Sequence, residues 1–439
     1  MTSGGAPSSP PQPRQRTFGA DVLLTAGSKA LFVLSTALIT VIVARSLGPD
    51  GQGTFAVAFS LTLLLVQLGS IGLPIANPYF AARHPEQQAT LVRLSLALSL
   101  ALAAVLALAT VLVNQLIPDL LQGLTRVQLA ITLGAIPAAL ASLYLQGVLL
   151  GQRRMLPYNA VELTQVASTL VALVLAFALA DPGLTAVLLI VGGGRYVALL
   201  VGLWSLRRLI LSAVPHAPGL ARRVLGHGSR VYVVGLLNFA LIRIDLLLVN
   251  AILGAGDAGQ YSIAVYIAEA LTILPMVIGT NLVPRVAVAR DSDLTAGVVR
   301  VLAPLWAAVC LLSIPAAVVG IPLIFGDSYR DAIPLYLWLV VGLYATGMLN
   351  ALITHYLVRG YSRSLMAVWV VALAGNVIFN IVLLPELGVV AAPILSTVAY
   401  TVVLIAHLHA FAGEIGGYRQ LRPTPRETLL LLRAAFASR

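Results

Sequence analysis

The chain has 439 residues, of which 59% are hydrophobic and only 10% are charged. Soluble domains carry roughly 25% charged residues, so this composition excludes a soluble protein. A membrane-spanning helix needs about 20 to 25 residues, and a dozen such helices would leave only short connections and two tails. The single cysteine, Cys310, excludes a disulfide framework and a cysteine-ligated metal centre.

Apolar stretches long enough to cross a membrane follow one another along the chain. The first half contains six of them, at 21–45, 53–80, 91–115, 127–150, 157–180 and 184–206. The second half contains six more, at 229–253, 260–284, 296–325, 332–358, 364–384 and 388–411. In lipid, backbone polar groups must bond within each segment, and barrel strands would alternate polar and apolar residues. We therefore predict an all-α polytopic membrane protein with twelve transmembrane helices.

Positive charge is distributed unevenly between the loops on the two sides of these spans. The net charge is +11, and all but one of the 27 basic residues are arginine. The tails and the loops on their side carry 21 of the 27, whereas the opposite loops carry three. The remaining three lie inside the spans: Lys29, Arg195 and Arg243. Because loops rich in Lys and Arg stay in the cytoplasm, we predict a multi-pass protein of the inner (plasma) membrane with both termini cytoplasmic. The net charge then reflects topology and not nucleic acid binding.

The two ends of the chain differ in composition. Residues 1–20 are rich in Pro, Ser and Gly and predict a flexible cytoplasmic tail, not a signal peptide. Residues 412–439 form a second cytoplasmic tail, in which Thr424-Pro425-Arg426-Glu427 carries an N-cap, a first-turn proline and a capping-box partner. A helix of about fifteen residues after this signal is too short to span, so we expect an interfacial helix, with a disordered tail as the alternative.

An internal repeat relates the two halves of the chain. A shift of 206 positions pairs Leu47-Gly48 with Leu253-Gly254, Gly53 with Gly259, and Pro78 with Pro284. Because this shift contains an even number of spans, both copies begin on the same side, and the repeat is parallel with its axis along the membrane normal. We therefore divide the chain into an N-lobe (21–206), a basic cytoplasmic connection (207–228) and a C-lobe (229–411). Two such lobes suit alternating access.

Three segments carry a resemblance to a known family. They are ARSLGPDGQGTFAVAFSL at 44–61, IRIDLLLVNAILGAGDAGQYSIAVY at 242–266, and GNVIFNIVLLPELGVVAAP at 375–393. Through the LGP turn with G-x-F/Y-x-x-A, the R-x-D segment, and N-x-x-x-N followed by L-P-x-x-G-x-x-A-A, the chain resembles the polysaccharide transporter family over about residues 18–411. This family comprises the oligosaccharide flippases, including those of O-antigen, in the multidrug/oligosaccharidyl-lipid/polysaccharide exporter superfamily. The resemblance implies two six-helix lobes around a central cavity and a lipid-linked glycan as cargo. Related lipid II flippases usually add two further spans after the twelfth, whereas only a short capped helix is expected here.

Six ionisable residues lie inside the predicted spans, three of each sign. They are Lys29, Glu162, Arg195, Arg243, Asp245 and Glu269. A charge at mid-depth in a membrane helix costs about 2.5 to 3.5 kcal/mol, so each should face a cavity or a partner. The alternative to a binding role is that these residues form structural ion pairs between helices. We expect structural ion pairs for Arg195 and Glu162.

The first helix carries a polar stripe, because Lys29 shares a helix face with Thr25, Thr36 and Thr40. The compact ammonium group of Lys29 suits a phosphate, although its position near the cytoplasmic end also allows it to snorkel to lipid headgroups. We assign Lys29, Thr36 and Thr40 to a substrate-binding site.

Helix seven offers two polar faces, one with Arg243 and Asn250 and one with Asn238 and Asp245. A guanidinium recognises a diphosphate through two parallel hydrogen bonds, so we predict that Arg243 and Asn250 bind substrate and that Asp245 braces a neighbouring helix. On helix eight, Glu269 is expected to pair with Arg243 or Lys29 when no cargo is bound. A buried carboxylate is a natural proton carrier, so Glu269 is the predicted coupling residue, with Asp245 as the second candidate.

The residues indicate neither a metal nor a cofactor. His355, His407 and His409 lack metal-ligand spacing relative to any nearby carboxylate, and no G-x-x-x-x-G-K-[ST] motif occurs. An enzyme such as a membrane glycan polymerase would need a catalytic loop with acid/base residues, whereas the longest connection, 207–228, contains no carboxylate. We therefore do not expect an enzyme.

The predicted function is a flippase for cell-surface polysaccharide biosynthesis. It would move a polyprenyl-diphosphate-linked oligosaccharide from the cytoplasmic to the outer leaflet by alternating access. A lipid II flippase and a drug or cation extruder of the same superfamily are alternatives, although a cationic drug disfavours a cavity with Lys29 and Arg243. Expected partners are the lipid-linked glycan, the bilayer, and the glycosyltransferases and polymerase of the same pathway, with no nucleic acid.

Overall fold

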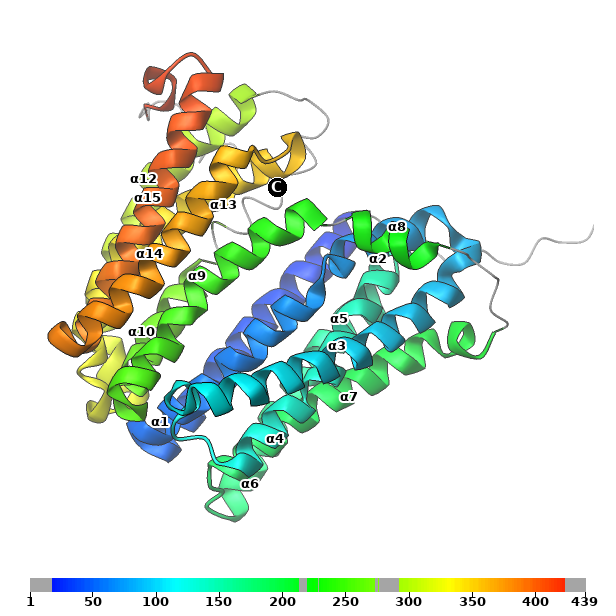
Figure 1. The fold of residues 1–439 in the computed structure, drawn as a ribbon, viewed down its shortest axis with the longest axis horizontal. Coiled ribbons are helices and arrows are strands. Elements are labelled where there is room, and N and C mark those ends of the chain that lie inside the picture. Colours follow the sequence, from blue (N-terminus) through cyan, green and yellow to red (C-terminus); the bar gives the residue numbers. More distant parts are fainter. Residues whose placement is uncertain (1–17, 213–218, 228, 273–274, 276–291, 423–439) are drawn as a thin grey trace, which may run out of the picture.

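The computed structural model describes residues 18–212, 219–227, 229–272, 275 and 292–422. These residues form helices joined by short connections, and no strand occurs among them. Figure 1 shows two helical bundles that meet at one end and lean apart toward the other end, where α8 lies. The predicted all-α membrane fold is confirmed.

The first bundle is formed by the N-terminal half of the chain. Its helices are α1 (Phe18–Ser70), α2 (Leu73–Arg83), α3 (Gln88–Leu116), α4 (Arg126–Gly134), α5 (Ile136–Gly151), α6 (Met155–Leu179) and α7 (Leu184–Leu211). Two short 3₁₀ turns flank α3, η1 (Pro85–Gln87) and η2 (Pro118–Leu121). We call this bundle the N-lobe.

The second bundle, the C-lobe, follows the connecting helix α8 (Leu220–His227). Its helices are α9 (Ser229–Leu253), α10 (Ala255–Leu271), α12 (Ser292–Phe325), α13 (Ala332–Arg359), α14 (Arg363–Leu387) and α15 (Ala391–Glu414). Its 3₁₀ turns are η3 (Asp327–Tyr329), η4 (Gly388–Val390) and η5 (Tyr418–Leu421). The interfacial helix predicted from Thr424 onward lies outside the described residues.

Nine helical stretches in the described part of the chain are long and apolar enough to cross a membrane. The stretches Gly27–Ser70 and Arg363–Ile415 contain 44 and 53 residues. Since about 20 residues suffice for one crossing, each is long enough for two. The expected helix 53–80 is broken, because Gly72 has φ = 80° and α2 begins after it. The expected span 260–284 includes residues outside the described ranges, so the count of twelve stays a prediction.

Each lobe has its own packed interior. In the C-lobe, the buried indole of Trp306 packs against α13 at Gly347, where a Cβ atom would come within 2.0 Å of the indole Nε1. The same Nε1 donates a hydrogen bond of 3.1 Å to the carbonyl of Leu343. In the N-lobe, the fully buried Tyr144 donates to the carbonyl of Gly69. Close packing and bonds of this kind hold helices together in lipid, where the hydrophobic effect between helices is absent.

The two lobes touch through their backbones at what we call the closed end, at the bottom of Figure 1. A Cβ atom on Gly53 would lie 1.8 Å from the carbonyl oxygen of Ala255, and one on Gly259 would lie 2.1 Å from that of Pro49. Only glycine permits such an approach. Gly53 and Gly259 are paired by the 206-residue shift, so the two copies of one motif face each other across the lobe boundary.

The turns that lead into this crossing also require glycine. Gly48 has φ = 67° and Gly254 has φ = 101°, and the same shift of 206 residues pairs them. Left-handed backbone of this kind is favourable for glycine and strained for other residues. The repeat that is visible in the sequence therefore coincides with the turns and the crossing of the closed end.

Side chains from the N-lobe reach the C-lobe at the same end. Arg45 donates hydrogen bonds of 2.6 Å to the carbonyls of Leu323 and Ile324 at the end of α12. In the opposite direction, the buried Tyr329 donates a 2.9 Å bond to the carbonyl of Ala44. The backbone crossing and these bonds between lobes close this end of the molecule.

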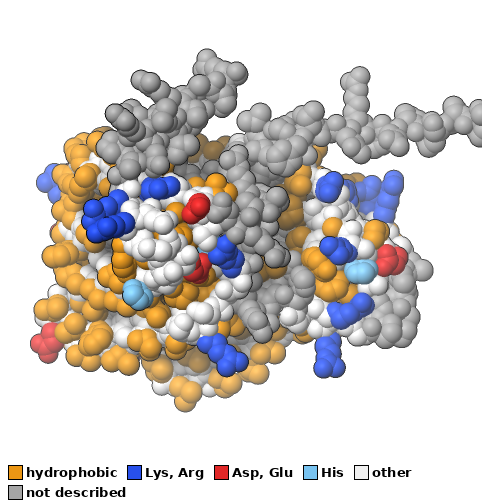
Figure 2. All heavy atoms as spheres, turned by 90° about the horizontal axis from the view of Figure 1, so that it is seen from above, with side chains coloured by type: hydrophobic (Ala, Val, Ile, Leu, Met, Phe, Trp, Pro, Cys, Tyr) orange, Lys and Arg blue, Asp and Glu red, His pale blue; other side chains and the backbone are white. Residues whose placement is uncertain are grey.

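At the opposite end, which we call the open end, α1 begins and α13 and α15 finish. Figure 2 looks onto it and shows Lys and Arg side chains gathered over both lobes. Helix α8 packs here through the buried Leu220 and Val224, while Arg222 and Arg223 are exposed. The basic side of the predicted topology is therefore the open end.

The closed end yields a first prediction. Replacing Gly53 by Val places a side chain where the backbone of Ala255 lies, so we expect the lobes to separate there. A reporter pair is Asp50→Cys with Gly256→Cys, because the Asp50 carboxylate lies 2.9 Å from the position that a Gly256 Cβ would take. In a chain without Cys310, oxidative cross-linking of this pair should fall several-fold in Gly53→Val.

Gly193→Val is the matched control, since a Cβ at this exposed position meets nothing within 4 Å. It should leave the cross-linking unchanged. Equal cross-linking in Gly53→Val and its parent would show that the backbone approach is not what holds the closed end together.

Candidate functional site

A cavity of about 1790 Å³ lies between the lobes. Pockets for drug-sized ligands usually measure about 300 to 1,000 Å³, so this cavity has room for a larger molecule. On the N-lobe side its walls come mainly from α1 and α6, and on the C-lobe side from α9, α10 and α13. It extends from Thr25, near the start of α1 at the open end, to Phe55 and Val265, which follow the turns of the closed end.

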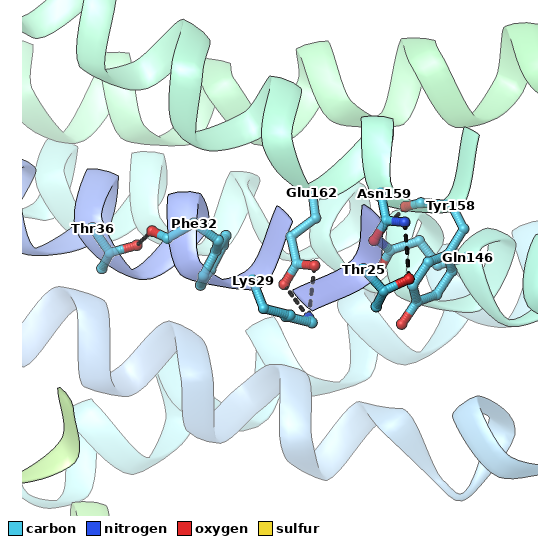
Figure 3. A network of polar contacts seen from close by, with 8 residues as sticks. All are labelled: Thr25, Lys29, Phe32, Thr36, Gln146, Tyr158, Asn159 and Glu162. Carbon is cyan, nitrogen blue, oxygen red and sulfur yellow. Dashed lines mark hydrogen bonds and ion pairs between the residues drawn. The ribbon is translucent and has the colours of Figure 1, made fainter. Parts of the chain in front are cut away.

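The N-lobe wall holds the first ion pair, which Figure 3 shows from close by. The ammonium nitrogen of Lys29 lies 2.6 and 2.7 Å from the two carboxylate oxygens of Glu162 on α6. The Lys29 side chain is 40% exposed, and both residues line the cavity. Nearby, Asn159 donates a 3.3 Å hydrogen bond to the hydroxyl of Thr25. The ammonium group therefore lies in the cavity wall next to a carboxylate.

Two threonines of the predicted stripe line the same wall, but their hydroxyl protons are already used. Thr36 donates to the carbonyl of Phe32 at 2.9 Å, and Thr40 donates to the carbonyl of Thr36 at 3.0 Å. Such a hydroxyl has only its acceptor lone pairs left. In this conformation Thr36 and Thr40 therefore offer acceptor lone pairs to the cavity.

The C-lobe wall holds the second ion pair. Arg243 Nη2 on α9 lies 2.7 Å from Glu269 Oε2 on α10, which is one of the two pairings expected for Glu269. The Arg243 side chain is 8% exposed and that of Glu269 is 30% exposed. Nε and Nη1 of Arg243, Oε1 of Glu269 and the hydroxyl of Tyr266 are buried and lack a hydrogen-bond partner among the described residues. Buried polar atoms without hydrogen-bond partners are unfavourable, so a polar ligand that bonds to them would stabilise this wall.

Asp245 lies behind the cavity wall and joins three helices. Its carboxylate accepts hydrogen bonds from Tyr261 on α10 at 2.5 Å and from Ser396 on α15 at 2.6 Å, and from its neighbouring amide, Leu246 N, at 2.8 Å. The network continues from Ser396 to Asn376 on α14 over 3.5 Å. Asp245 thus occupies the bracing position that was expected from its face of helix seven.

Asn250 lies elsewhere than predicted. Its side chain is fully buried and donates a 3.0 Å bond to the carbonyl of Gln122 in the N-lobe. Seven residues of helix separate it from Arg243, which corresponds to about 10 Å of helical rise. This distance carries Asn250 past the cavity floor into the closed end. The prediction that Asn250 shares a binding surface with Arg243 is therefore corrected, and Asn238 lines the cavity on α9 instead.

Glu162 and Arg195 do not pair with each other. Glu162 is bound to Lys29, as described above. Arg195 is buried on α7, and no carboxylate within the described ranges forms an ion pair with it. Its neighbour Gly194 explains the burial, because a Cβ there would lie 2.1 Å from the hydroxyl of Thr169 on α6. The close approach of α6 and α7 encloses Arg195 within the lobe.

The structure adds lining residues that sequence reasoning missed. Thr346 and Asn350 line the cavity on α13, and Asn350 donates a 3.1 Å bond to the carbonyl of Thr346. Their spacing of four in an apolar helix was the signal that could have revealed them. Gln165 on α6 is a further addition, and Tyr266 on α10 lines the cavity on the same helix as Glu269.

The buried histidines lie apart from the cavity lining. His355 contacts Thr295 and Glu414 at 3.0 and 3.1 Å, and His407 contacts Tyr361 at 3.2 Å. No group of three potential ligands among His, Cys, Asp and Glu occurs in the described part of the chain. These histidines serve as hydrogen-bonded links between helices of the C-lobe.

Comparisons with solved structures show where this fold has been seen before. A lipid II flippase, MurJ, in an inward closed conformation matches with a TM-score of 0.64 at 13% identity, covering 89% of this chain and 87% of that one. A multidrug resistance transporter of the MATE family, in an inward-facing conformation, matches with a TM-score of 0.61 at 13% identity, covering 90% and 98%. A MOP superfamily transporter from Pyrococcus furiosus Vc1 matches with a TM-score of 0.56 at 15% identity, covering 89% and 94%. At these identities the likeness concerns the fold.

The sequence itself matches one family over most of its length. None of the curated protein sequences matches the chain. The model of the family described as "Polysaccharide biosynthesis protein" matches residues 18–289. This match covers more than half of the 439 residues and includes the first two of the three segments that carried the resemblance. The chain therefore belongs to the polysaccharide biosynthesis protein family, with the fold of the MOP superfamily flippases and transporters.

Proposed function

We propose that this protein is a flippase that moves a polyprenyl-diphosphate-linked oligosaccharide from the cytoplasmic to the outer leaflet. Its family and its structural neighbours are flippases and transporters, not enzymes. The observation that carries the proposal is the charge pattern of the cavity. Lys29 on the N-lobe and Arg243 on the C-lobe both line it, and each is held by a single carboxylate.

The charges of this pattern fit a diphosphate. Nε and Nη1 of Arg243 are buried and lack a hydrogen-bond partner among the described residues, and a guanidinium binds phosphate oxygens through parallel bonds. Lys29 adds a second, compact cation from the other lobe. Without cargo, Glu162 and Glu269 neutralise these two cations, and the third cation of the lining, Arg153, is exposed. Cargo binding replaces these carboxylates with phosphate or acidic sugar groups.

The distribution of arginine supports the proposed orientation. The positive-inside rule assigns the arginine-rich end to the cytoplasm, so both termini are cytoplasmic and the headgroup is loaded from the cytoplasm in this conformation. The closed end then faces outward. Opening it requires separation of the Gly53 and Gly259 backbones, after which the cavity releases the headgroup outside.

Glu269 is the proposed coupling residue. Its Oε2 is paired with Arg243, whereas its Oε1 has no partner among the described residues, and the side chain is 30% exposed to the cavity. When the cargo binds Arg243, the Glu269 carboxylate loses its partner in a low-dielectric site, which favours uptake of a proton. Asp245, the second candidate, is bound by Tyr261 and Ser396 and is less accessible.

A lipid II flippase is the second candidate function, favoured by the fold match to MurJ with a TM-score of 0.64. A cationic drug as cargo would instead bind Glu162 and Glu269, which Lys29 and Arg243 already neutralise. Competition between labelled lipid II and an undecaprenyl-diphosphate oligosaccharide in one flipping assay separates the two lipid-linked cargoes.

The orientation predicts the labelling of two loops that α3 separates. Glu86 in η1 and Asp119 in η2 are exposed carboxylates at opposite ends of this helix. In intact cells without Cys310, an impermeant maleimide should label Asp119→Cys and leave Glu86→Cys unlabelled, while permeabilised cells should show both. The reverse pattern in intact cells would refute the orientation.

The charge pattern predicts that Lys29→Met and Arg243→Met each weaken apparent cargo affinity. A hydrogen bond to a charged group contributes about 1.5 to 3 kcal/mol, which corresponds to roughly tenfold to a hundredfold in binding. The measurement is flipping of a fluorescent polyprenyl-diphosphate oligosaccharide in proteoliposomes. Arg330→Met, an exposed arginine in the loop before α13, is the control and should flip as wild type.

A double variant separates cargo binding from a purely structural ion pair. Lys29→Met combined with Glu162→Gln removes both charges and leaves no orphaned carboxylate. If Lys29 binds cargo, the double variant stays impaired. Full recovery of transport would mean that Lys29 only neutralises Glu162, and the cationic-cavity hypothesis would fail at this residue.

The coupling role predicts the behaviour of Glu269→Gln, which keeps size and hydrogen bonding but cannot ionise. Flipping by wild type should respond to an imposed pH gradient, and flipping by Glu269→Gln should not. Glu162→Gln alters the other cavity carboxylate and should keep the response. If Glu269→Gln responds to the gradient as wild type does, Glu269 is not the coupling residue, and Asp245→Asn tests the second candidate.

A further inference from the structure

A second, smaller hollow of about 320 Å³ lies beside the main cavity, and we call it the side pocket. The N-lobe contributes part of its wall from α1, α2 and α5, and the C-lobe contributes the rest from α9 and α13. Most of the side chains that line it are apolar, among them Pro74, Ile75, Leu143, Val234 and Leu357. The side pocket is therefore an apolar gap between the two lobes.

The side pocket continues the main cavity. Asn238 on α9 and Ile353 on α13 line both hollows. Along α9, Arg243 lies in the main cavity, Asn238 lies at the junction, and Gly235 and Tyr232 lie in the side pocket. The helical rise places Asn238 about 8 Å from Arg243 and about 9 Å from Tyr232 along the axis. The Arg243–Glu269 ion pair thus lies within two turns of Asn238 on one side, and the mostly apolar side pocket lies within two turns on the other.

We propose that the side pocket binds the first part of the polyprenyl chain while the diphosphate and glycan occupy the main cavity. This inference rests on the proposed flippase function and adds a subsite for the lipid part of the cargo. Burying each CH₂ group of such a chain away from water contributes about 0.8 kcal/mol, so the chain favours apolar walls over the two ion pairs of the main cavity. It must leave that cavity through an apolar gap next to the phosphate site, and the side pocket adjoins that site.

The surroundings of the pocket connect it to the bilayer. Leu68 on α1, Ile75 on α2 and Val233 on α9 are exposed large apolar side chains, at 40%, 42% and 42%. In a membrane, exposed apolar side chains at these positions contact lipid. Ile75 belongs to the pocket lining as well, so one surface runs from the junction at Asn238 to the lipid-facing side. The remaining length of the polyprenyl chain extends along it into the hydrocarbon layer.

Two residues shape the pocket. The Tyr232 hydroxyl donates a 2.6 Å hydrogen bond to the carbonyl of Leu68 and so joins the lobes beside the gap. Gly235 leaves room within it, because a Cβ there would meet only the amide nitrogen of Gln67, at 3.8 Å. A glycine inside a helix lowers its stability by about 0.5 to 1 kcal/mol relative to alanine. Gly235 in α9 therefore indicates a position where the absence of a side chain keeps the pocket open.

Filling the pocket is the first test. Gly235→Phe should place a ring in the gap and reduce flipping of a polyprenyl-diphosphate oligosaccharide at least tenfold. Gly235→Ala adds only a methyl group in ordinary contact distance and should flip at the wild-type rate. Gly193→Phe, an equally large change on an exposed face of α7 with nothing within 4 Å, should also flip as wild type.

Binding of the headgroup separates a filled pocket from a misfolded protein. A water-soluble inorganic diphosphate should bind wild type and Gly235→Phe equally, measured by calorimetry in nanodiscs, because it needs only the cations of the main cavity. Loss of flipping with intact diphosphate binding supports the proposal. Wild-type flipping by Gly235→Phe overturns it and leaves the flippase function standing.

Photo-cross-linking locates the chain directly. The probe is a farnesyl diphosphate analogue with a diazirine on its isoprenoid chain, added to the protein in phosphatidylcholine nanodiscs. Labelling should fall on residues 67–75 and 232–238 and should be suppressed by undecaprenyl diphosphate. Labelling elsewhere, or occupancy by phosphatidylcholine that undecaprenyl diphosphate does not displace, overturns the side-pocket assignment. If the wild-type protein neither flips the lipid-linked glycan nor binds the probe, the proposed function fails, and the inference fails with it.

Discussion

The arrangement of this protein depends on direct backbone contact between the two lobes at Gly53 and Gly259. Each position lies so close to a carbonyl of the other lobe that no larger residue fits in this conformation. Two helical bundles that touch at one end through their backbones, and are joined there by bonds from Arg45 and Tyr329, can diverge only at the other end. The large cavity is a consequence of that divergence, and so is its opening on the arginine-rich side.

Electrostatics decides how such a cavity remains stable without cargo. Charged groups in a low-dielectric setting are tolerated when they are paired, and each lobe supplies its own pair within its wall. Lys29 is bound by Glu162 from the same lobe, and Arg243 is bound by Glu269 from the same lobe. No ion pair between these four residues bridges the lobes, so separation or closure of the lobes breaks neither pair. In the proposed function an anionic headgroup competes for these cations, which links its binding to the charge state of the released carboxylates.

The lipid-linked cargo that we propose would place two demands on this protein, and the two neighbouring hollows would meet them separately. The main cavity carries two ion pairs among its apolar lining residues, whereas the side pocket has mostly apolar walls and no charged residue among the described ones that line it. Asn238 and Ile353, which line both, mark the boundary where a diphosphate would give way to an isoprenoid chain. The same helix, α9, carries Arg243 on one side of this boundary and Gly235 on the other. Helix α9 therefore contributes residues to both hollows, one for the polar part and one for the apolar part of the proposed cargo.

The sequence by itself determined the features that depend on composition and on regular spacing. Long apolar runs predict membrane helices because lipid offers no partner to the backbone, and the paired glycines 206 residues apart marked the turns that the structure later placed at the closed end. The sequence also limited the expected ion-pair partner of Glu269 to Arg243 or Lys29. Only the tertiary structure decided which residues contact one another and which line the cavity, because these depend on the position along each helix and on how the helices pack. Asn250 shares a helix face with Arg243 but lies about 10 Å further along the axis, beyond the cavity floor. Glu162 pairs with Lys29 because α6 packs beside α1, and Arg195 is enclosed because Gly194 lets α6 and α7 approach. The side pocket could not be predicted, since five helices from both lobes form it and none of them carries a motif for it.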